Sequence, residues 1–147
     1  MIADTIQKKI QEALKARDEI RLSTLRLLSS ALNYEFIAKQ HKLSEEEEIA
    51  VVQREAKRRK DAIEAYEKAQ ALERAEKEKK ELAILQEYLP AQMSPEQLSE
   101  LVDEAISEVG AKALGDMGKV IGMVMSKAKG RVDGSEVSVI VKEKLSG

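Results

Sequence analysis

The feature that most constrains the fold is a helical periodicity that runs from one end of the chain to the other. Apolar residues recur at every third or fourth position, and no stretch shows the strict alternation of a half-buried strand. The first apolar stripe consists of Ile2, Ile6, Ile10 and Leu14. It predicts a helix over residues 3–16. Ala, Leu, Glu, Lys and Arg dominate the composition, as they do in long helices. We therefore predict an all-α protein.

Helix-capping residues divide this periodicity into separate helices. The second helix is expected to run from its N-cap, Asp18, to about Lys39. Its apolar face comprises Leu22, Leu25, Leu28 and Leu32, with Leu27 and Ala31 beside it. Ser44 and Glu47 have the spacing of a capping box, and residues 45–48 place four negative charges where the helix dipole favours them. The glutamate run therefore predicts the start of a third helix rather than a metal or acidic-ligand site.

The third and fourth helices are expected to form a long hairpin. The third runs towards Gln70, and its inward positions are Ile49, Val52, Ala56, Ile63 and Tyr66. The inward positions of the fourth are Leu72, Ala75, Leu82, Leu85 and Leu89. No strong helix breaker lies between residues 67 and 75, so one continuous helix remains an alternative.

A proline pair marks the boundary between two domains. Pro90 ends the fourth helix, because the residue before a proline is displaced from the helical conformation. Ser94 and Pro95 then have the residue types of an N-cap and a first helical position. We place the boundary at 90–94, which gives a helical N-terminal domain of residues 1–90 and a small C-terminal domain of residues 91–147. The second domain is expected to hold three helices, of which the first stops at Gly110 and the last is capped by Asp133.

Composition excludes several classes of function. The chain has no cysteine, and hence no disulfide framework or thiolate metal site. It shows no apolar core of a signal peptide, and no apolar run approaches the ~20 residues of a membrane span. We expect a cytoplasmic protein without metal or cofactor.

The net charge of −2 disfavours a strongly nucleic-acid-binding domain, but the charge is unevenly distributed. Residues 112–131 carry five basic residues and one acidic residue, whereas residues 96–108 carry five acidic residues and no basic one.

The segment GDMGKVIGMVMSKAKG, residues 115–130, has four glycines, and it predicts a helix from about Asp116 to Lys129 with Gly130 at its end. Each glycine in a helix interior costs about 0.5–1 kcal/mol relative to alanine. At 100° per residue the apolar side comprises Met117, Val120, Ile121, Val124 and Ala128. Away from it lie Gly118, Gly122, Lys119, Ser126 and Lys129. Two interpretations stay open: the glycines are spacers for close helix packing, or they form a docking surface for a phosphate backbone.

Three ordered motifs resemble those of the GatB/YqeY family. They are Tyr88-Leu89-Pro90, the run from Asp116 to Gly122, and Lys129-Gly130-Arg131. Stand-alone bacterial members of this family resemble the whole chain. The C-terminal unit of this chain, residues 91–147, also resembles the tail of the GatB chain of the glutamine-dependent aspartyl/glutamyl-tRNA amidotransferase. In that enzyme the tail helps to hold tRNA. The resemblance implies tRNA contacts for Gly118, Lys119, Gly122, Lys127, Lys129 and Arg131.

No catalytic residue is predicted for this chain alone. The single histidine, His41, lies in a predicted linker, and no phosphate-binding glycine loop for ATP is present. Arg54, Lys57 and Arg58 share one face of the third helix. They are either solvated and balanced by acids of the neighbouring helix, or a second RNA-contacting patch.

Together these features predict a non-catalytic accessory protein that engages tRNA or a tRNA-processing enzyme. It would act by positioning through phosphate contacts, because a chain with so few aromatic residues offers little for base stacking. One alternative is a helical protein-interaction module. Another is a part of a carbon–nitrogen ligase that uses glutamine as the amide donor.

Overall fold

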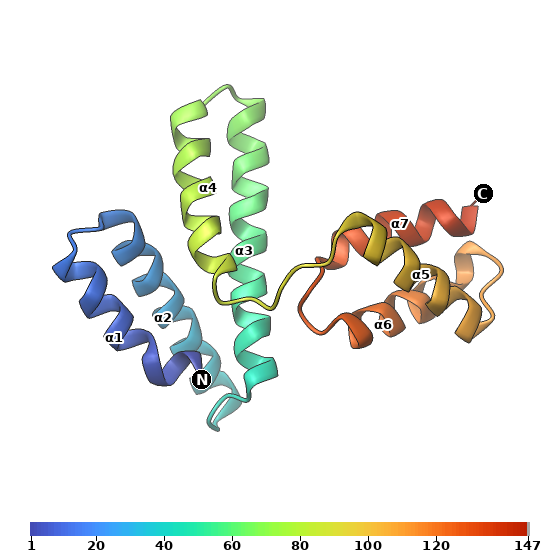
Figure 1. Ribbon diagram of the computed structural model, residues 1–147, viewed down its shortest axis with the longest axis horizontal. Helices are drawn as coiled ribbons and strands as arrows, with labels where there is room; N and C mark the ends of the chain where they lie inside the picture. The colour runs from blue at the N-terminus through green and yellow to red at the C-terminus, as the bar shows by residue number, and fades with distance from the viewer. Residues whose placement is uncertain (147) are drawn as a thin grey trace. The chain divides into compact units, whose positions relative to one another are not determined.

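The computed structural model describes residues 1–146, which form helices joined by short connections (Figure 1). In chain order these are α1 (Ile2–Lys15), α2 (Glu19–Lys39), α3 (Glu45–Lys68), α4 (Leu72–Gln86), α5 (Pro95–Val109), α6 (Met117–Ala128) and α7 (Gly134–Ser146). A short 3-10 helix, Leu114–Asp116, leads into α6. No strand occurs among the described residues, so the all-α prediction is confirmed.

The predicted N-caps are present in the structure. The carboxylate of Asp18 accepts the backbone N–H of Arg21 at 3.0 Å. The side chains of Ser44 and Glu47 each accept a hydrogen bond from the other residue's backbone N–H, at 3.2 and 3.0 Å. Ser94 and Gln97 form a second capping box of the same kind at the start of α5. These bonds satisfy backbone donors that have no partner within the helix, and they fix where α2, α3 and α5 begin.

The chain breaks between α3 and α4, so the alternative of one continuous helix is wrong. Gln70 adopts a left-handed conformation with φ of 58°. The N–H of Ala71 donates to the carbonyl of Tyr66 at 2.8 Å, and the N–H of Gln70 donates to that of Glu67 at 3.1 Å. This pair of bonds is a Schellman motif, which usually carries glycine at the left-handed position. Glutamine stands there instead, which is why the sequence showed no breaker.

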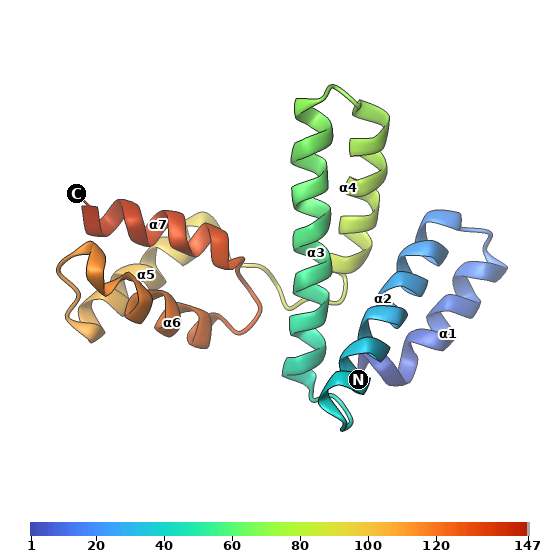
Figure 2. The same cartoon turned by 180° about the vertical axis from the view of Figure 1, so that it is seen from behind.

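Contacts divide the chain into two compact units, Met1–Leu89 and Pro90–Gly147. In the first unit α1 packs on α2 and α3 packs on α4, and α2 also contacts α3 and α4. The apolar core of the first unit comprises Ile6, Ile10, Ala13, Leu25, Leu28, Leu32, Leu43, Val51, Val52, Ile84 and Leu85. In both views α2 lies between α1 and α3 (Figures 1 and 2).

Some residues of the predicted apolar faces lie outside this core. Leu14, Leu27 and Leu72 are exposed, whereas Val51, which was not predicted to face inward, is almost fully buried. The buried side of α3 also includes a carboxylate, Glu48, which is 1% exposed. Its two oxygens accept the backbone N–H groups of Ile2 and Ala3 at 3.0 and 2.7 Å. The last glutamate of the acidic run therefore caps α1, in addition to its place in the first turn of α3.

The second unit is built from α5, α6 and α7, each of which packs on the other two. Its core comprises Leu98, Val102, Ala105, Val120, Val124, Ala128, Val132, Val137 and Val141. The 3-10 helix contacts both α6 and α7. This arrangement buries one side of α6 and leaves its glycine-bearing side at the surface.

Candidate nucleic-acid interface

The exposed side of α6 carries both of its glycines. Gly118 and Gly122 are exposed, and a methyl group built on either would have no described atom within 4 Å, apart from its chain neighbours and α6's own backbone. Spacing a neighbouring helix within the C-terminal unit is therefore not what these glycines do. We use the name glycine face for Gly118, Lys119, Gly122, Ser126 and Lys129, which the helical period places on one side of α6 or at its end.

The carboxylate of Asp116 stabilises the turn that precedes α6. One oxygen of Asp116 accepts the backbone N–H groups of Lys112 and Ala113 at 3.0 and 3.3 Å. These two bonds lower the pKa of Asp116, and the charge of Lys119 lowers it further, so the group is ionised at neutral pH. Its role is local: it fixes the turn that leads into α6.

The predicted basic residues do not form one cluster. Lys119 and Lys129 are exposed and form no ion pair with another described residue. Lys127 lies on a different side of α6, where its ammonium is 2.7 Å from the carboxylate of Glu108 on α5. The Nε of Arg131 donates to the carbonyl of Ala91 at 2.8 Å.

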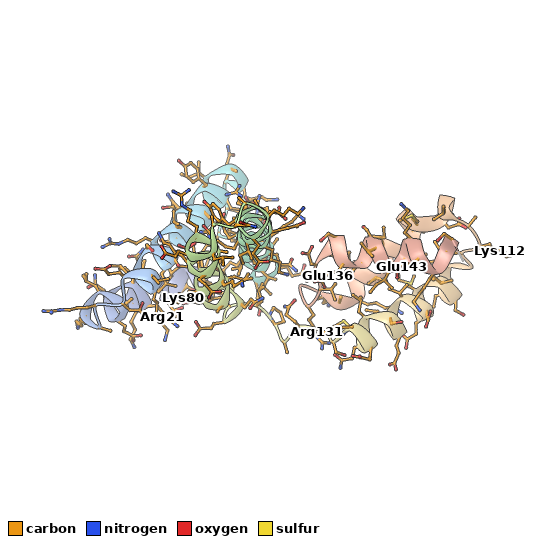
Figure 3. The ribbon with its side chains drawn as sticks, turned by 90° about the horizontal axis from the view of Figure 1, so that it is seen from above. Arg21, Lys80, Lys112, Arg131, Glu136 and Glu143 are labelled. Atoms are coloured by element: carbon orange, nitrogen blue, oxygen red, sulfur yellow. The ribbon has the colours of Figure 1, made fainter. Side chains whose placement is uncertain are left out.

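Two further basic residues of the unit are also far apart. Arg131 and Lys112 lie at opposite ends of the C-terminal unit (Figure 3). Hence Lys119 and Lys129 are the two cations that accompany Gly118 and Gly122 on the glycine face, and the positive surface is narrow.

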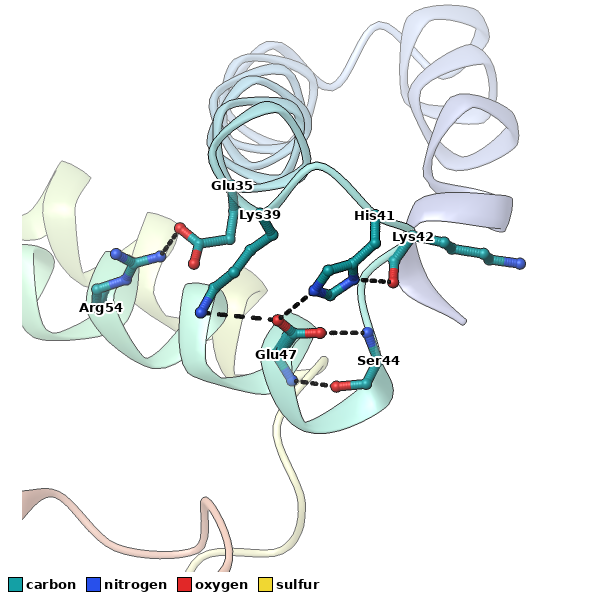
Figure 4. A network of polar contacts seen from close by, with 7 residues as sticks. All are labelled: Glu35, Lys39, His41, Lys42, Ser44, Glu47 and Arg54. Carbon is teal, nitrogen blue, oxygen red and sulfur yellow. Dashed lines mark hydrogen bonds and ion pairs between the residues drawn. The ribbon is translucent and has the colours of Figure 1, made fainter.

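The second predicted patch, on α3, is largely balanced by acids within its own unit. Arg54 pairs with Glu35 of α2 at 2.8 Å (Figure 4), and Arg58 pairs with Glu55 of α3 at 3.1 Å. Lys57 is exposed and forms no ion pair with another described residue. These contacts favour the interpretation of a solvated, internally balanced helix face.

Sequence reasoning missed an apolar surface on α2. Leu27, Tyr34 and Ile37 are 51%, 76% and 61% exposed, and the helical period places them on one side of the helix. The available signal was that α2 carries large apolar residues on more than one side. A groove of about 490 Å³ lies between α1, α2 and the α2–α3 connection, and its lining includes Phe36 and Leu43.

The structure offers no metal centre among residues 1–146: no group of three or more His, Cys, Asp or Glu side chains could hold an ion. The Nδ1 of His41 lies 2.8 Å from the carbonyl oxygen of Lys42, and its Nε2 lies 3.7 Å from the carboxylate of Glu47 (Figure 4). Within the same described range no helix has the length and apolarity needed to cross a bilayer.

These features define a class of protein: an all-α chain with two helical cores and an exposed glycine–lysine side on one helix of the second. The family model described as Yqey-like protein matches residues 3–145, and the chain belongs to this family.

Three relatives extend this comparison. An uncharacterized protein of Schizosaccharomyces pombe is 32% identical over 89 residues, which cover 60% of this chain and 72% of the relative. The E chain of the glutamyl-tRNA(Gln) amidotransferase of Thermococcus gammatolerans is 34% identical over 79 residues, or 45% of this chain and 13% of that relative. The mitochondrial protein altered inheritance of mitochondria protein 41 of Vanderwaltozyma polyspora is 29% identical over 110 residues, or 73% of this chain and 60% of that protein. The present chain thus spans less than two thirds of the length of the last two.

Proposed function

We propose that this chain is a non-catalytic accessory protein of tRNA-dependent amidotransferase chemistry, and that its glycine face docks on the phosphate backbone of tRNA. Membership of the Yqey-like family and the partial similarity to a component of an amidotransferase support the amidotransferase-related role. We propose in addition that the chain binds tRNA or an enzyme that processes tRNA. A cytoplasmic location stays a prediction, since one relative is a mitochondrial protein.

The exposure of Gly118 and Gly122 is the observation that carries this proposal. Gly122 lies inside α6 and Gly118 lies in its first turn, so both weaken the helix, Gly122 more strongly. No described neighbour in their own unit requires these positions to lack a side chain. Glycine does allow another molecule to approach the helix backbone closely. Lys119 and Lys129 place positive charge beside and at the end of the same strip, as contact with phosphates requires.

The composition of the second unit restricts how it can recognise RNA. Residues 90–147 contain no Phe, Tyr, Trp or His, so no aromatic ring is available there to stack on an unpaired base. Contact through phosphates alone predicts weak sequence preference and strong dependence on salt. The protein would therefore position a tRNA rather than select one by its bases.

The experiment is a titration of the purified chain with total tRNA at several salt concentrations. Wild type is expected to bind at low salt, and the logarithm of its affinity should fall linearly with the logarithm of salt concentration. Substituting Lys119→Ala together with Lys129→Ala should weaken binding at least about tenfold at low salt and reduce the salt slope by about one for each phosphate that is no longer neutralised. Lys8→Ala in combination with Lys15→Ala removes the same charge from exposed sites elsewhere, and binding should change little.

The apolar surface of α2 supports a second candidate, a protein-interaction module. Large exposed aromatic and aliphatic side chains gathered on one helix are typical of protein contact sites. If this function dominates, Tyr34→Ser with Ile37→Ser should abolish binding to the tRNA-processing partner, with little dependence on salt. Leu72→Ser is the matched control, because Leu72 is similarly exposed but lies at the start of α4.

We further propose that the chain has no catalytic activity by itself. A role inside a larger carbon–nitrogen ligase would then show as a change in the rate of that enzyme when the chain is added. Robust glutamine-dependent amidation or ATP hydrolysis by the purified chain would contradict this part of the proposal.

A further inference from the structure

The segment Pro90–Met93, which we call the strap, is fastened to the turn between α6 and α7. The backbone N–H of Met93 donates to the carbonyl of Arg131 at 3.0 Å. The side-chain amide of Gln92 donates to the carbonyls of Gly130 and Pro90 at 3.2 and 2.9 Å. The Nε of Arg131 returns a bond to the carbonyl of Ala91 at 2.8 Å. Three hydrogen bonds therefore join two segments that lie about forty positions apart in the sequence.

Two consecutive residues of the turn that the strap holds have a positive φ. Lys129 is left-handed with φ of 41°, and Gly130 follows with φ of 85°. For a lysine this conformation costs roughly 1–2 kcal/mol relative to the right-handed region. At Arg17 and Gln70 the same conformation is accompanied by helix-end bonds alone. Besides the helix-end bonds of Lys129 and Arg131 to α6, the strap supplies contacts on the next two carbonyls, those of Gly130 and Arg131.

Lys129 is also one of the two cations of the glycine face, so the strap and this face share the turn. We infer that Gln92 and Arg131 are positioning residues for RNA docking: they fasten the strap to the turn and thereby hold Lys129 where it meets a phosphate. This inference rests on the proposed function of the glycine face. It also changes the role of Arg131, which acts through Ala91 rather than by direct contact with RNA.

A reciprocal effect follows from linkage. If an ordered strap favours binding of RNA at the turn, then bound RNA stabilises the strap to the same degree. The strap belongs to the second unit, so docking of RNA stabilises its hydrogen bonds to the turn within that unit. The amide of Met93 reports this state directly, since its exchange with solvent requires the bond to Arg131 to open.

Two substitutions separate positioning from charge. Gln92→Ala removes the contact to Gly130 without altering charge, and it should weaken tRNA binding roughly three- to tenfold with an unchanged salt slope. Arg131→Lys keeps the charge but lacks the Nε–H that reaches Ala91, and it should weaken binding about as much. If Arg131 instead contacts phosphate through its charge, Arg131→Lys will bind as wild type does. Gln11→Ala, an exposed glutamine of α1, is the matched control.

The deciding experiment follows hydrogen exchange at the Met93 amide together with tRNA binding, on full-length variants whose circular dichroism matches wild type. The inference expects faster exchange in Gln92→Ala and Arg131→Lys, slower exchange of the wild-type amide on addition of tRNA, and weaker binding by both variants. If wild type binds tRNA without any change in exchange at the Met93 amide, the positioning role of the strap is contradicted and the proposed function stays intact. Wild type that binds no tRNA at any salt overturns both.

Discussion

At the scale of single residues, a buried carboxylate and a partly exposed one make opposite contributions to the first unit. Glu48 is satisfied by two backbone N–H groups at the start of α1. Glu78 lies on α4 near Glu81, and both carboxylates face the guanidinium of Arg59 at 3.5 and 2.9 Å. The first carboxylate accepts both N–H groups, whereas the second shares one cation with a like charge.

Glu48→Ala is expected to lower the free energy of unfolding by about 2–3 kcal/mol. The substitution leaves the N–H groups of Ile2 and Ala3 without their acceptor and removes an anion from the positive end of α1. Chemical denaturation measures the change. Glu46→Ala, in the same turn of α3 but exposed, should alter stability by less than about 0.5 kcal/mol. Equal effects of the two would contradict the capping role.

Glu78→Gln is expected to stabilise the protein at pH 7. Burial, and then the charge of Glu81, raise the pKa of Glu78 above its ordinary value of 4.5, although Arg59 opposes the shift. The folded state therefore binds this proton more tightly than the unfolded state does. Its stabilising effect is fully present below the unfolded pKa and is lost as the pH rises through the folded pKa.

The comparison with wild type should accordingly depend on pH. The advantage of Glu78→Gln is expected near neutrality and should shrink as the pH falls towards and below 4.5. Thermal unfolding across this range measures it, with the exposed Glu73→Gln as a control. A variant that is less stable than wild type at pH 7 would show that the pairing with Arg59 outweighs the burial.

At the scale of elements, α3 and α4 show how a turn can be hidden in a sequence. The left-handed residue that ends α3 is Gln70, and the same arrangement ends α1 at Arg17. In both cases the Schellman hydrogen bonds form without glycine. Helix ends with such residues carry strain that a glycine would relieve.

Gln70→Gly should therefore raise the free energy of unfolding by about 0.5–1 kcal/mol, the left-handed strain removed less the added flexibility of the unfolded chain. Gln86→Gly, within the right-handed last turn of α4, provides the opposite case and should destabilise. Denaturant unfolding of both variants gives the comparison. A loss of stability in Gln70→Gly would mean that the glutamine side chain contributes more than the strain removes.

Helix N-termini capped by a polar side chain could be predicted, because the capping residue and the backbone N–H that it accepts lie three residues apart. Asp18, Ser44 and Ser94 all belong to this group. Gln70 could not be found this way, since its conformation is fixed by backbone bonds. Nor could the role of Glu48 be predicted, because its partners in α1 are more than forty positions away.

The same distinction applies to the candidate interface. The exposure of Gly118 and Gly122 follows from the helical period and agrees with the placement expected from sequence. The partners of Lys127 and Arg131 depend on packing against Glu108 and on the strap at Ala91. Such tertiary contacts leave no pattern in a single sequence.

At the scale of the whole molecule, each unit has a core of its own. The core residues of the first unit all lie between Ile6 and Leu85, and those of the second all lie between Leu98 and Val141. Many domains of roughly 55–65 residues fold alone, which is the size range of the second unit. The backbone bonds that end at the strap also belong entirely to this second unit.

A fragment of residues 90–147 is therefore expected to fold by itself. Its amide NMR spectrum should overlay that of the same residues in the full chain, and Val124→Ala should destabilise it without altering the exchange of α1 to α4 in the full chain. A fragment that stays unfolded would show that the second core depends on the first.

The glycine face is tested most directly by the full chain with Gly118→Ala and Gly122→Ala together. Because a methyl group meets nothing at either position, both changes should strengthen α6, by about 0.5–1 kcal/mol at Gly122 and by less at Gly118 in the first turn, and raise the Tm by at least about 2 °C. The measurement is the affinity for total tRNA at low salt, taken on the same samples. The account predicts a more stable protein that binds at least about tenfold more weakly, since the helix backbone can no longer approach the phosphates. A more stable protein with unchanged affinity would contradict it.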